Sequence, residues 1–380
     1  MYTQPSNLQK NNPLYLRRIV IQNFRNIELQ ELEFSPNVNC ISGNNGEGKT
    51  NLMDAVYYLS MTKSAFGASD KFNFRYTQNS FALSGTYAMP GGIESRFSIC
   101  VSADGTKTLK RDDKNCPKIS DHIGILPVVM VSPSDISLVS ESGEERRRFA
   151  NSVISQLDRA YLSNLQQYNR LLLQRNKLLK DGVSDLSLLD TFDERLDALA
   201  TPVFKTRQDF TESLRPVVKD FYSQLSGGLE NVDIEYKSDL QKGSLKEILA
   251  LARDRDRVLK FTGSGIQRDD FIFTLNGYPI RKCGSQGQQK SFLVALKFAQ
   301  YEIMKASYGF APIMLLDDLF DKLDMDRVGY LLKMVSGNDF GQIFISDSNK
   351  VRLSSLVDGL TENRSYFMAA GGTFNQDGKR

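Results

Sequence analysis

GNNGEGKT, residues 43–50, is the stretch on which the interpretation of this chain rests. It fits the pattern G-x-x-x-x-G-K-[ST], in which glycines let consecutive backbone N–H groups converge on an anion. The apolar run at 38–42 predicts a buried strand before it, and the apolar spacing at 52–59 predicts an amphipathic helix after it. In this strand, loop and helix setting, the stretch predicts a phosphate-binding loop, and both flanks disfavour a chance glycine turn.

Each residue of this loop is predicted to contact ATP, and two of them have roles of their own. Lys49 supplies a positive charge for the outer phosphates, and the Thr50 hydroxyl is placed to hold Mg²⁺. The predicted ATP-binding residues of the loop are Gly43, Asn44, Asn45, Gly46, Glu47, Gly48, Lys49 and Thr50.

The apolar run at 313–316 ends in two aspartates, Asp317 and Asp318. A carboxylate at the carboxyl end of a buried parallel strand faces the crevice where α/β sheets bind ligands. Asp317 is therefore predicted to hold Mg²⁺ together with Thr50, and Asp318 to activate the attacking water as a general base, catalytic alongside Lys49. The alternative, an Asp-Asp pair that only ends a strand, is weak beside a complete phosphate loop.

A second glycine-rich segment, at 284–288, precedes a long apolar-periodic helix. Glycines and a serine at a helix N-terminus form an anion site, which a single nucleotide already held by the first loop does not need. Such a site is useful if it closes on the γ-phosphate of a partner chain, and this predicts a nucleotide-dependent dimer. The residues concerned are Ser285, Gly287 and Gln288.

The remaining periodicities divide the chain. Alternation over 81–101 predicts an antiparallel meander, continued by a hairpin around Gly105, whereas helical spacing governs 144–225 and a capping box at 244–247 opens another helix. The predicted fold is an α/β ATPase head with an antiparallel β subdomain and an inserted helical arm. The predicted boundaries are a disordered leader at 1–13, the head at 14–140 and 258–371, the helical insertion at 141–257 and a flexible tail at 372–380.

The composition excludes several classes of protein. No run of the 380 residues approaches the 18 apolar residues of a membrane span, and the first twelve residues are polar, so a cytoplasmic location is expected. The four cysteines show no C-x-x-C spacing and His122 is the only histidine, which argues against a zinc ribbon and a histidine-built metal site.

A net charge of +3 argues at first against a nucleic-acid partner, but the charge is unevenly distributed. Residues 144–180 contain eight basic and three acidic side chains, a local +5, so the remaining chain sums to −2. The alternative is an ordinary solvated helix face. The residues predicted to contact DNA phosphates are Arg146, Arg147, Arg148, Arg170, Arg175 and Lys177.

The motifs in this order resemble the ATPase heads of the SMC-like branch of ABC ATPases, and within it the RecF family of bacterial recombinational repair. The resemblance covers about residues 15–367. It is carried by Asn23-Phe24-Arg25-Asn26, the loop at 43–52, Ser132-Pro133 with 145–149, Gln267-Arg268-Asp269-Asp270, the segment at 285–289, and 315–320 with Leu323-Asp324.

This resemblance implies a function. It implies a weak, DNA-stimulated ATPase that dimerises on ATP, binds DNA at single-strand gaps and at double-strand/single-strand junctions, acts with RecR and RecO, and assists loading of the recombinase RecA. Ser285 would meet the γ-phosphate across the dimer, Asp324 would be the D-loop carboxylate, and Arg25 and Asn26 would lie near the nucleotide.

The chain departs from these patterns in three places. No glutamine occurs between Gln78 and Gln156, where ABC ATPases have their Q-loop glutamine, and Ser346-Asp347-Ser348 stands where a switch histidine is expected. Gln267 replaces histidine in the family's H-R-D-D string. The first two departures favour a slow ATPase used as a switch. The alternatives at this point are the ATP-binding subunit of an ABC transporter or another SMC-like ATPase.

Overall fold

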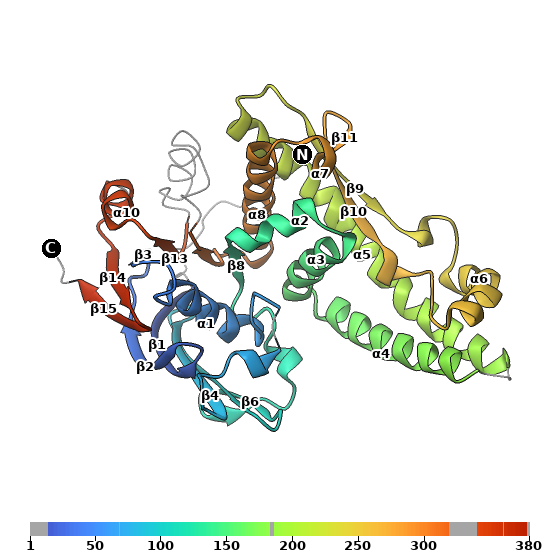
Figure 1. Ribbon diagram of the computed structural model, residues 1–380, viewed down its shortest axis with the longest axis horizontal. Coiled ribbons are helices and arrows are strands. Elements are labelled where there is room, and N and C mark those ends of the chain that lie inside the picture. The colour runs from blue at the N-terminus through green and yellow to red at the C-terminus, as the bar shows by residue number, and fades with distance from the viewer. Residues whose placement is uncertain (1–13, 68, 183–185, 319–339, 360, 378–380) are drawn as a thin grey trace. The chain divides into compact units, whose positions relative to one another are not determined.

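The computed structural model describes residues 14–67, 69–182, 186–318, 340–359 and 361–377. These residues form two compact units, each with its own internal contacts. The first unit combines the chain up to Asp135 with the chain from Gln300 onward, and the second unit is the intervening segment, 136–299 (Figure 1). The head of the predicted fold is therefore built from two distant parts of the chain.

A six-stranded sheet in the first unit carries the predicted phosphate loop. Its order is β15-β14-β3-β13-β12-β8, and neighbouring strands are parallel except for the β14 and β15 pair. Every residue of β3, β8, β12 and β13 is buried, which explains why these strands are mainly apolar and do not alternate with polar residues. The strands are β3 (Val38–Ser42), β8 (Val128–Val131), β12 (Ile313–Leu316), β13 (Ile343–Asp347), β14 (Arg364–Ala370) and β15 (Thr373–Asp377).

The second sheet of this unit is antiparallel, in the order β2-β1-β4-β5-β6-β7. Buried residues alternate along β4, as its period-two sequence requires, and β4, β5 and β6 pair in turn, which confirms the predicted meander and its hairpin. The strands are β1 (Tyr15–Phe24), β2 (Ile27–Glu33), β4 (Ser80–Ala88), β5 (Glu94–Ser102), β6 (Lys107–Arg111) and β7 (Lys114–Asn115).

Helix α1 (Lys49–Met61) joins the two sheets into one hydrophobic core. Its apolar side chains Leu52, Val56 and Leu59 belong to the same buried cluster as Phe81 of the antiparallel sheet and Leu315 of the parallel sheet. Figure 1 shows α1 in blue beside β1 and β3. Because β3 ends at Ser42 and α1 begins at Lys49, the connecting loop is anchored at both ends by buried structure. Helix α10 (Lys350–Val357) follows β13.

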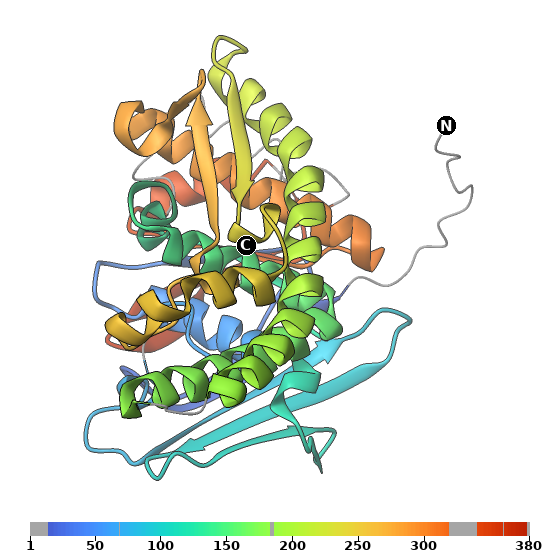
Figure 2. The ribbon, with the colours of Figure 1, turned by 90° about the vertical axis from the view of Figure 1, so that its right-hand side faces the viewer.

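The second unit is mainly helical (Figure 2). The apolar stripe from 149 to 172 is divided between two helices, because the Asp158 side chain accepts hydrogen bonds from the backbone N–H groups of Ala160 and Tyr161 and starts a new helix. Conversely, α5 continues through Pro202 and Pro216, although proline usually kinks or interrupts a helix. The helices are α2 (Ser137–Ser140), α3 (Gly143–Leu157), α4 (Arg159–Asp181), α5 (Leu186–Ser226), α6 (Leu245–Leu259), α7 (Ile280–Cys283) and α8 (Gln286–Tyr308), the last of which continues into the first unit.

The observed boundaries differ from those predicted. A three-stranded antiparallel sheet, with β10 (Asp270–Leu275) between β9 (Val232–Lys237) and β11 (Tyr278–Pro279), belongs to the helical unit. Because β10 pairs with β9, residues 258–299 belong to this unit, so the insertion predicted at 141–257 is too short. Residues 373–377 form β15 in place of the predicted tail, and the leader at 1–13 lies outside the described residues.

Candidate active site

The loop between β3 and α1 has a backbone that only glycine fits at two of its positions. Gly48 has φ 108°, and a Cβ there would lie 2.9 Å from the Asn26 amide. Gly43 has φ 152°, and a Cβ there would lie 2.6 Å from the Ala369 carbonyl oxygen of β14. The glycines are therefore needed for two reasons: the backbone has positive φ at these positions, and other segments of the same chain approach it closely.

Lys49 closes this loop from the first turn of α1. Its side chain is buried, and Nζ donates hydrogen bonds to the carbonyl oxygens of Gly43, at 2.8 Å, and Asn44, at 3.2 Å. The same nitrogen lies 3.8 Å from Asp318 Oδ1. The ammonium group is thus held inside the loop, next to the carboxylate of Asp318, which lies two residues after β12.

Thr50 and Asp317 meet although 267 residues separate them in the sequence. The Thr50 hydroxyl donates to Asp317 Oδ2 at 2.8 Å, and burial raises the pKa of the Asp317 carboxyl. Within the described residues no group of three or more histidine, cysteine, aspartate or glutamate side chains could hold a metal ion. Two adjacent hard oxygen donors fit Mg²⁺, provided that phosphate oxygens complete its shell.

Ser346 is a site residue that sequence reasoning missed. Its hydroxyl donates to Asp317 Oδ1 at 2.6 Å and accepts the Asp318 N–H at 2.9 Å, where the backbone of Asp318 has φ 42°. In the parallel pairing of β12 with β13, Leu316 lies opposite Ile345, so Ser346 lies level with Asp317. The sequence offered one indication of its role. Ser346 begins the Ser-Asp-Ser segment that stands where a switch histidine is expected.

Arg25 lies behind the loop, in a network of its own. Its guanidinium lies 2.6 Å from Asp54 and donates to Ser64 at 2.9 Å, and it is packed against the rings of Phe24 and Phe66. Burial raises the pKa of Asp54, and the Arg25 charge opposes that rise. Arg25 is thus engaged with protein groups, and its contacts with Asn51, Asp54 and Ser64 support α1 and the segment that follows it.

Asn26 contacts the loop directly. Its Oδ1 accepts a hydrogen bond from Asn51 Nδ2 at 2.7 Å, and its amide lies against Gly48. On the other side of the loop, the Glu47 carbonyl oxygen accepts the Gly372 N–H at 2.9 Å. The loop is thus fastened to the β1–β2 turn and to the β14–β15 turn.

The second predicted anion site begins α8, in the helical unit. The Ser285 N–H donates to Gln288 Oε1 at 2.7 Å, and the Gln288 N–H donates to Ser285 Oγ at 3.2 Å, a reciprocal cap. Gly287 lies between them in the first turn, and Ser285 is exposed. The predicted D-loop residue Asp324 lies outside the described residues.

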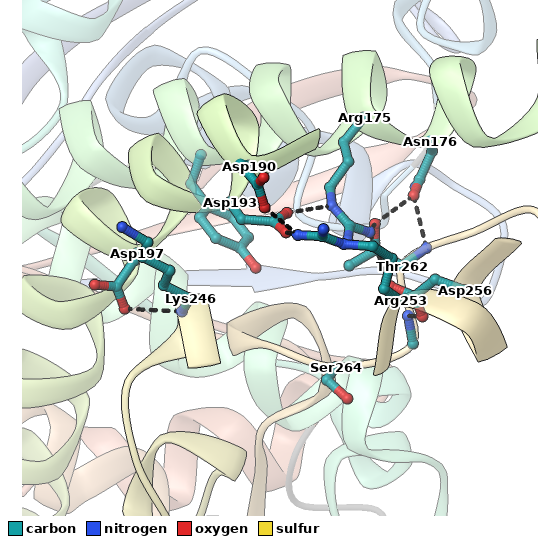
Figure 3. Close-up of polar contacts among 12 residues, drawn as sticks. Arg175, Asn176, Asp190, Asp193, Asp197, Lys246, Arg253, Asp256, Thr262 and Ser264 are labelled. Carbon is teal, nitrogen blue, oxygen red and sulfur yellow. Dashed lines mark hydrogen bonds and ion pairs between the residues drawn. The ribbon is translucent and has the colours of Figure 1, made fainter. Parts of the chain in front are cut away.

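Two of the arginines predicted to bind DNA are in fact buried in ion pairs. Arg146 is 3% exposed and contacts both carboxylate oxygens of Asp270, at 2.8 and 3.1 Å. Arg175 is 0% exposed and lies 2.7 Å from Asp193 and 2.8 Å from Asp256 (Figure 3). The predictions for Arg146 and Arg175 are wrong, because these buried guanidinium groups cannot reach a phosphate without leaving their carboxylate partners unpaired.

The other four basic residues are more accessible. Arg170 and Lys177 are exposed on α4 and lie seven residues apart, so they share one face of the helix. Arg148 is exposed but paired with Glu144 and Glu145, and Arg147 is half-buried. The predicted DNA contacts therefore rest mainly on Arg170 and Lys177.

The residues at the family's broken motifs have structural contacts. Gln267 accepts a hydrogen bond from Tyr168 at 2.5 Å and donates to the Ser264 carbonyl oxygen at 2.7 Å. Asp347 is buried and pairs with Arg352 at the start of α10. Both residues are thus held by contacts within the protein.

Comparison with known proteins identifies the family. The family described as RecF/RecN/SMC N terminal domain matches residues 15–362. A DNA replication and repair protein RecF from Parabacteroides distasonis is 42% identical over 93% of this chain and 97% of its own length. The RecF of Bacteroides fragilis is 40% identical over 96% of this chain and 98% of its own. The chain belongs to the RecF family.

Solved structures agree with the RecF assignment. A structure of the recombination mediator RecF with ATP, from the RecFOR pathway, has TM-score 0.88 and 29% identity and covers 98% of this chain and 100% of that one. An Smc head domain from Pyrococcus furiosus, at TM-score 0.56 and 13% identity, shares the fold. The fold is thus the ABC-type ATPase head predicted from the motifs, and RecF membership removes the transporter alternative. No helix in the described residues is long and apolar enough to cross a membrane.

Proposed function

We propose that this chain is an ATP-dependent DNA-binding protein of recombinational repair, in which ATP joins two copies and slow hydrolysis releases them. The single observation that supports this most directly is the contact of Thr50 with Asp317, at 2.8 Å, because it unites the phosphate loop and the carboxylate strand in one site. RecF relatives are named as DNA replication and repair proteins, and a solved RecF is described with ATP.

Different groups in and beside the loop would bind the phosphates and the Mg²⁺ of ATP. The backbone N–H groups at the start of α1 would receive the phosphates, and Lys49 would exchange its contacts with the Gly43 and Asn44 carbonyl oxygens for phosphate oxygens. Thr50 and Asp317 would hold Mg²⁺, which when bound supplies positive charge to the phosphate oxygens. Asp317 is already buried beside the loop, so this arrangement needs little movement.

Asp318 is the proposed general base. It follows Asp317 at the end of β12, and its side chain lies 3.8 Å from the Lys49 ammonium, so it faces the position of the outer phosphates. Its carboxylate would accept the proton of the attacking water. The neighbouring Ser346 has a hydroxyl in the strand where a switch imidazole is expected, and a hydroxyl neither gains nor loses charge near neutral pH. Slow hydrolysis is the expected result.

The other half of the ATP site would come from a second copy. Ser285, Gly287 and Gln288 lie at the exposed start of α8, where backbone N–H groups and a hydroxyl can receive a γ-phosphate held by the partner. Asp324 would add the D-loop carboxylate to the same interface. Because these residues, 285–288, here called the signature segment, would complete the site only in trans, ATP binding and dimerisation are coupled.

DNA would bind to the exposed basic face of α4. Arg170 and Lys177 would contact phosphates, which favours affinity without base readout. Reversing both charges should reduce the slope of log K against log salt on duplex DNA by about 1.8, at about 0.9 for each lost phosphate contact. Lys110→Glu with Lys114→Glu makes the same change in net charge on the antiparallel sheet, where both residues are exposed, and should leave the slope unchanged.

Sedimentation velocity with and without ATP tests the proposed function, using gapped DNA, intact duplex and added RecR or RecO. The expected result is an ATP-dependent dimer that binds gapped DNA more tightly than duplex and gains mass with the partner. A monomer at saturating ATP would overturn the dimer. Equal affinity for gapped and intact DNA would overturn the proposed role at gaps.

A further inference from the structure

The signature segment is connected to the long helix of the same unit by a chain of three side chains. Gln288 Nε2 donates to Glu230 Oε1 at 2.6 Å, and the other oxygen of Glu230 accepts the Tyr222 hydroxyl at 2.5 Å. Tyr222 is 1% exposed, in the last turns of α5. Glu230 lies between α5 and β9 in the sequence, 58 residues from Gln288, and belongs to none of the motifs of the ATP site.

These hydrogen bonds determine which way the Gln288 amide points. A carboxylate only accepts hydrogen bonds, so Glu230 requires the NH₂ end of the amide, and the amide oxygen is left to face Ser285. That oxygen accepts the Ser285 N–H at 2.7 Å, while the Gln288 N–H donates to Ser285 Oγ at 3.2 Å. The Ser285 hydroxyl therefore accepts from the helix and keeps its proton available to donate outward.

We propose that Glu230 is a positioning residue of the ATP site: through Gln288 it holds Ser285 ready to receive the γ-phosphate bound by a second copy. The inference rests on the proposed dimer. A glutamine amide without this partner can turn over, presenting NH₂ to the Ser285 N–H, and two facing donors would open the cap. Glu230 does not touch the nucleotide, so its effect falls on dimerisation and not on ATP binding by the single chain.

Glu230 is held in place from the helical arm, through Tyr222 of α5. Tyr222 is fixed by burial in α5, and it contacts the ring of Phe292 of α8 at a centroid distance of 6.3 Å. One hydroxyl thus holds Glu230 from the arm side, and one amide holds it from the signature side. The helical arm and the signature segment consequently share a polar connection within one unit, in addition to their hydrophobic packing.

Glu230→Ala is the first test, with sedimentation under ATP and nucleotide binding to the monomer as separate measurements. We expect the ATP-dependent dimer to weaken roughly tenfold, the loss of a hydrogen bond to a charged group, while monomer affinity for ATP and the unfolding temperature stay near those of the unsubstituted chain. Glu235→Ala is the control, because it removes an exposed carboxylate from β9 five residues further on. Glu230→Gln keeps one acceptor and should lie between the two.

A paired exchange distinguishes positioning from a general structural role. Gln288→Glu alone places two carboxylates together and should weaken the dimer, whereas Gln288→Glu with Glu230→Gln restores one donor and one acceptor across the contact and should recover most of the loss. A dimer that is unchanged in Glu230→Ala would overturn the inference, as would failure of the paired exchange to recover. If the unsubstituted chain forms no dimer with ATP, the proposed function itself fails, and this is a different result.

Discussion

The two predicted anion sites differ in how completely a single chain builds them. In the loop at 43–50 the lysine is buried, its ammonium is bonded to carbonyl oxygens, and the threonine is bonded to a carboxylate 267 residues away. In the segment at 285–288 the serine is exposed, and its hydrogen bonds run to Gln288 and Gln289, in the first turn of its own helix. The first site is thus held together by contacts within one chain, whereas the second presents an exposed serine at the start of a helix.

The largest expected effect is on the rate of ATP hydrolysis, which depends on the first site. Asp318→Asn should lower the turnover of ATP by roughly 10²–10⁴-fold, because the general base is lost, while ATP still binds and dimers still form. Single-turnover hydrolysis and sedimentation on the same sample measure both. Turnover equal to that of the unsubstituted protein would remove Asp318 from the role of base.

Nucleotide binding by the first site should depend on its lysine. Lys49→Ala removes a charge-assisted contact worth roughly 1.5–3 kcal/mol and should weaken ATP binding about 10- to 100-fold, and the dimer should disappear with it. Titration calorimetry of the single chain gives the affinity. Lys71→Ala, an exposed lysine in the same unit, should bind ATP normally. Unchanged binding by Lys49→Ala would show that the loop does not receive the phosphates.

The second site should affect only assembly. Ser285→Arg should weaken the ATP-dependent dimer about tenfold, because the long side chain fills space that the γ-phosphate needs, at a typical overpacking cost of roughly 1–3 kcal/mol. Monomer affinity for ATP should not change, since Ser285 is exposed and outside the loop. Measuring both on one preparation contrasts the two sites directly. Loss of monomer binding would mean that the second site is needed by a single chain.

The smallest expected effect is on stability and its pH dependence. Burial raises the pKa of Asp317 above its unfolded value, so its ionised form destabilises the nucleotide-free fold. Asp317→Asn should stabilise that fold at neutral pH by on the order of 1 kcal/mol, a common trade against function. The gain should vanish as the pH falls below the unfolded pKa, where both states are protonated. Denaturant unfolding at pH 7 and below pH 4 tests this, and a gain independent of pH would contradict it.

Much of this protein was determined locally in the sequence. Glycine spacing, an apolar strand before it and a helix after it predicted the phosphate loop, because the loop's backbone geometry depends on residues that are neighbours in the chain. The meander, the Asp317-Asp318 strand end and the cap at Ser244 followed from the same local periodicities, and the structure shows them.

Tertiary structure decided what lies far apart in the sequence. Charge along 144–180 does not distinguish Arg175, whose guanidinium is paired with carboxylates from two other helices, from Arg170, which faces solvent, because burial depends on which elements pack together. The sequence does not predict the roles of Ser346 and Glu230 for the same reason. Each acts through a partner 28 to 58 residues away, and no local pattern encodes such a contact.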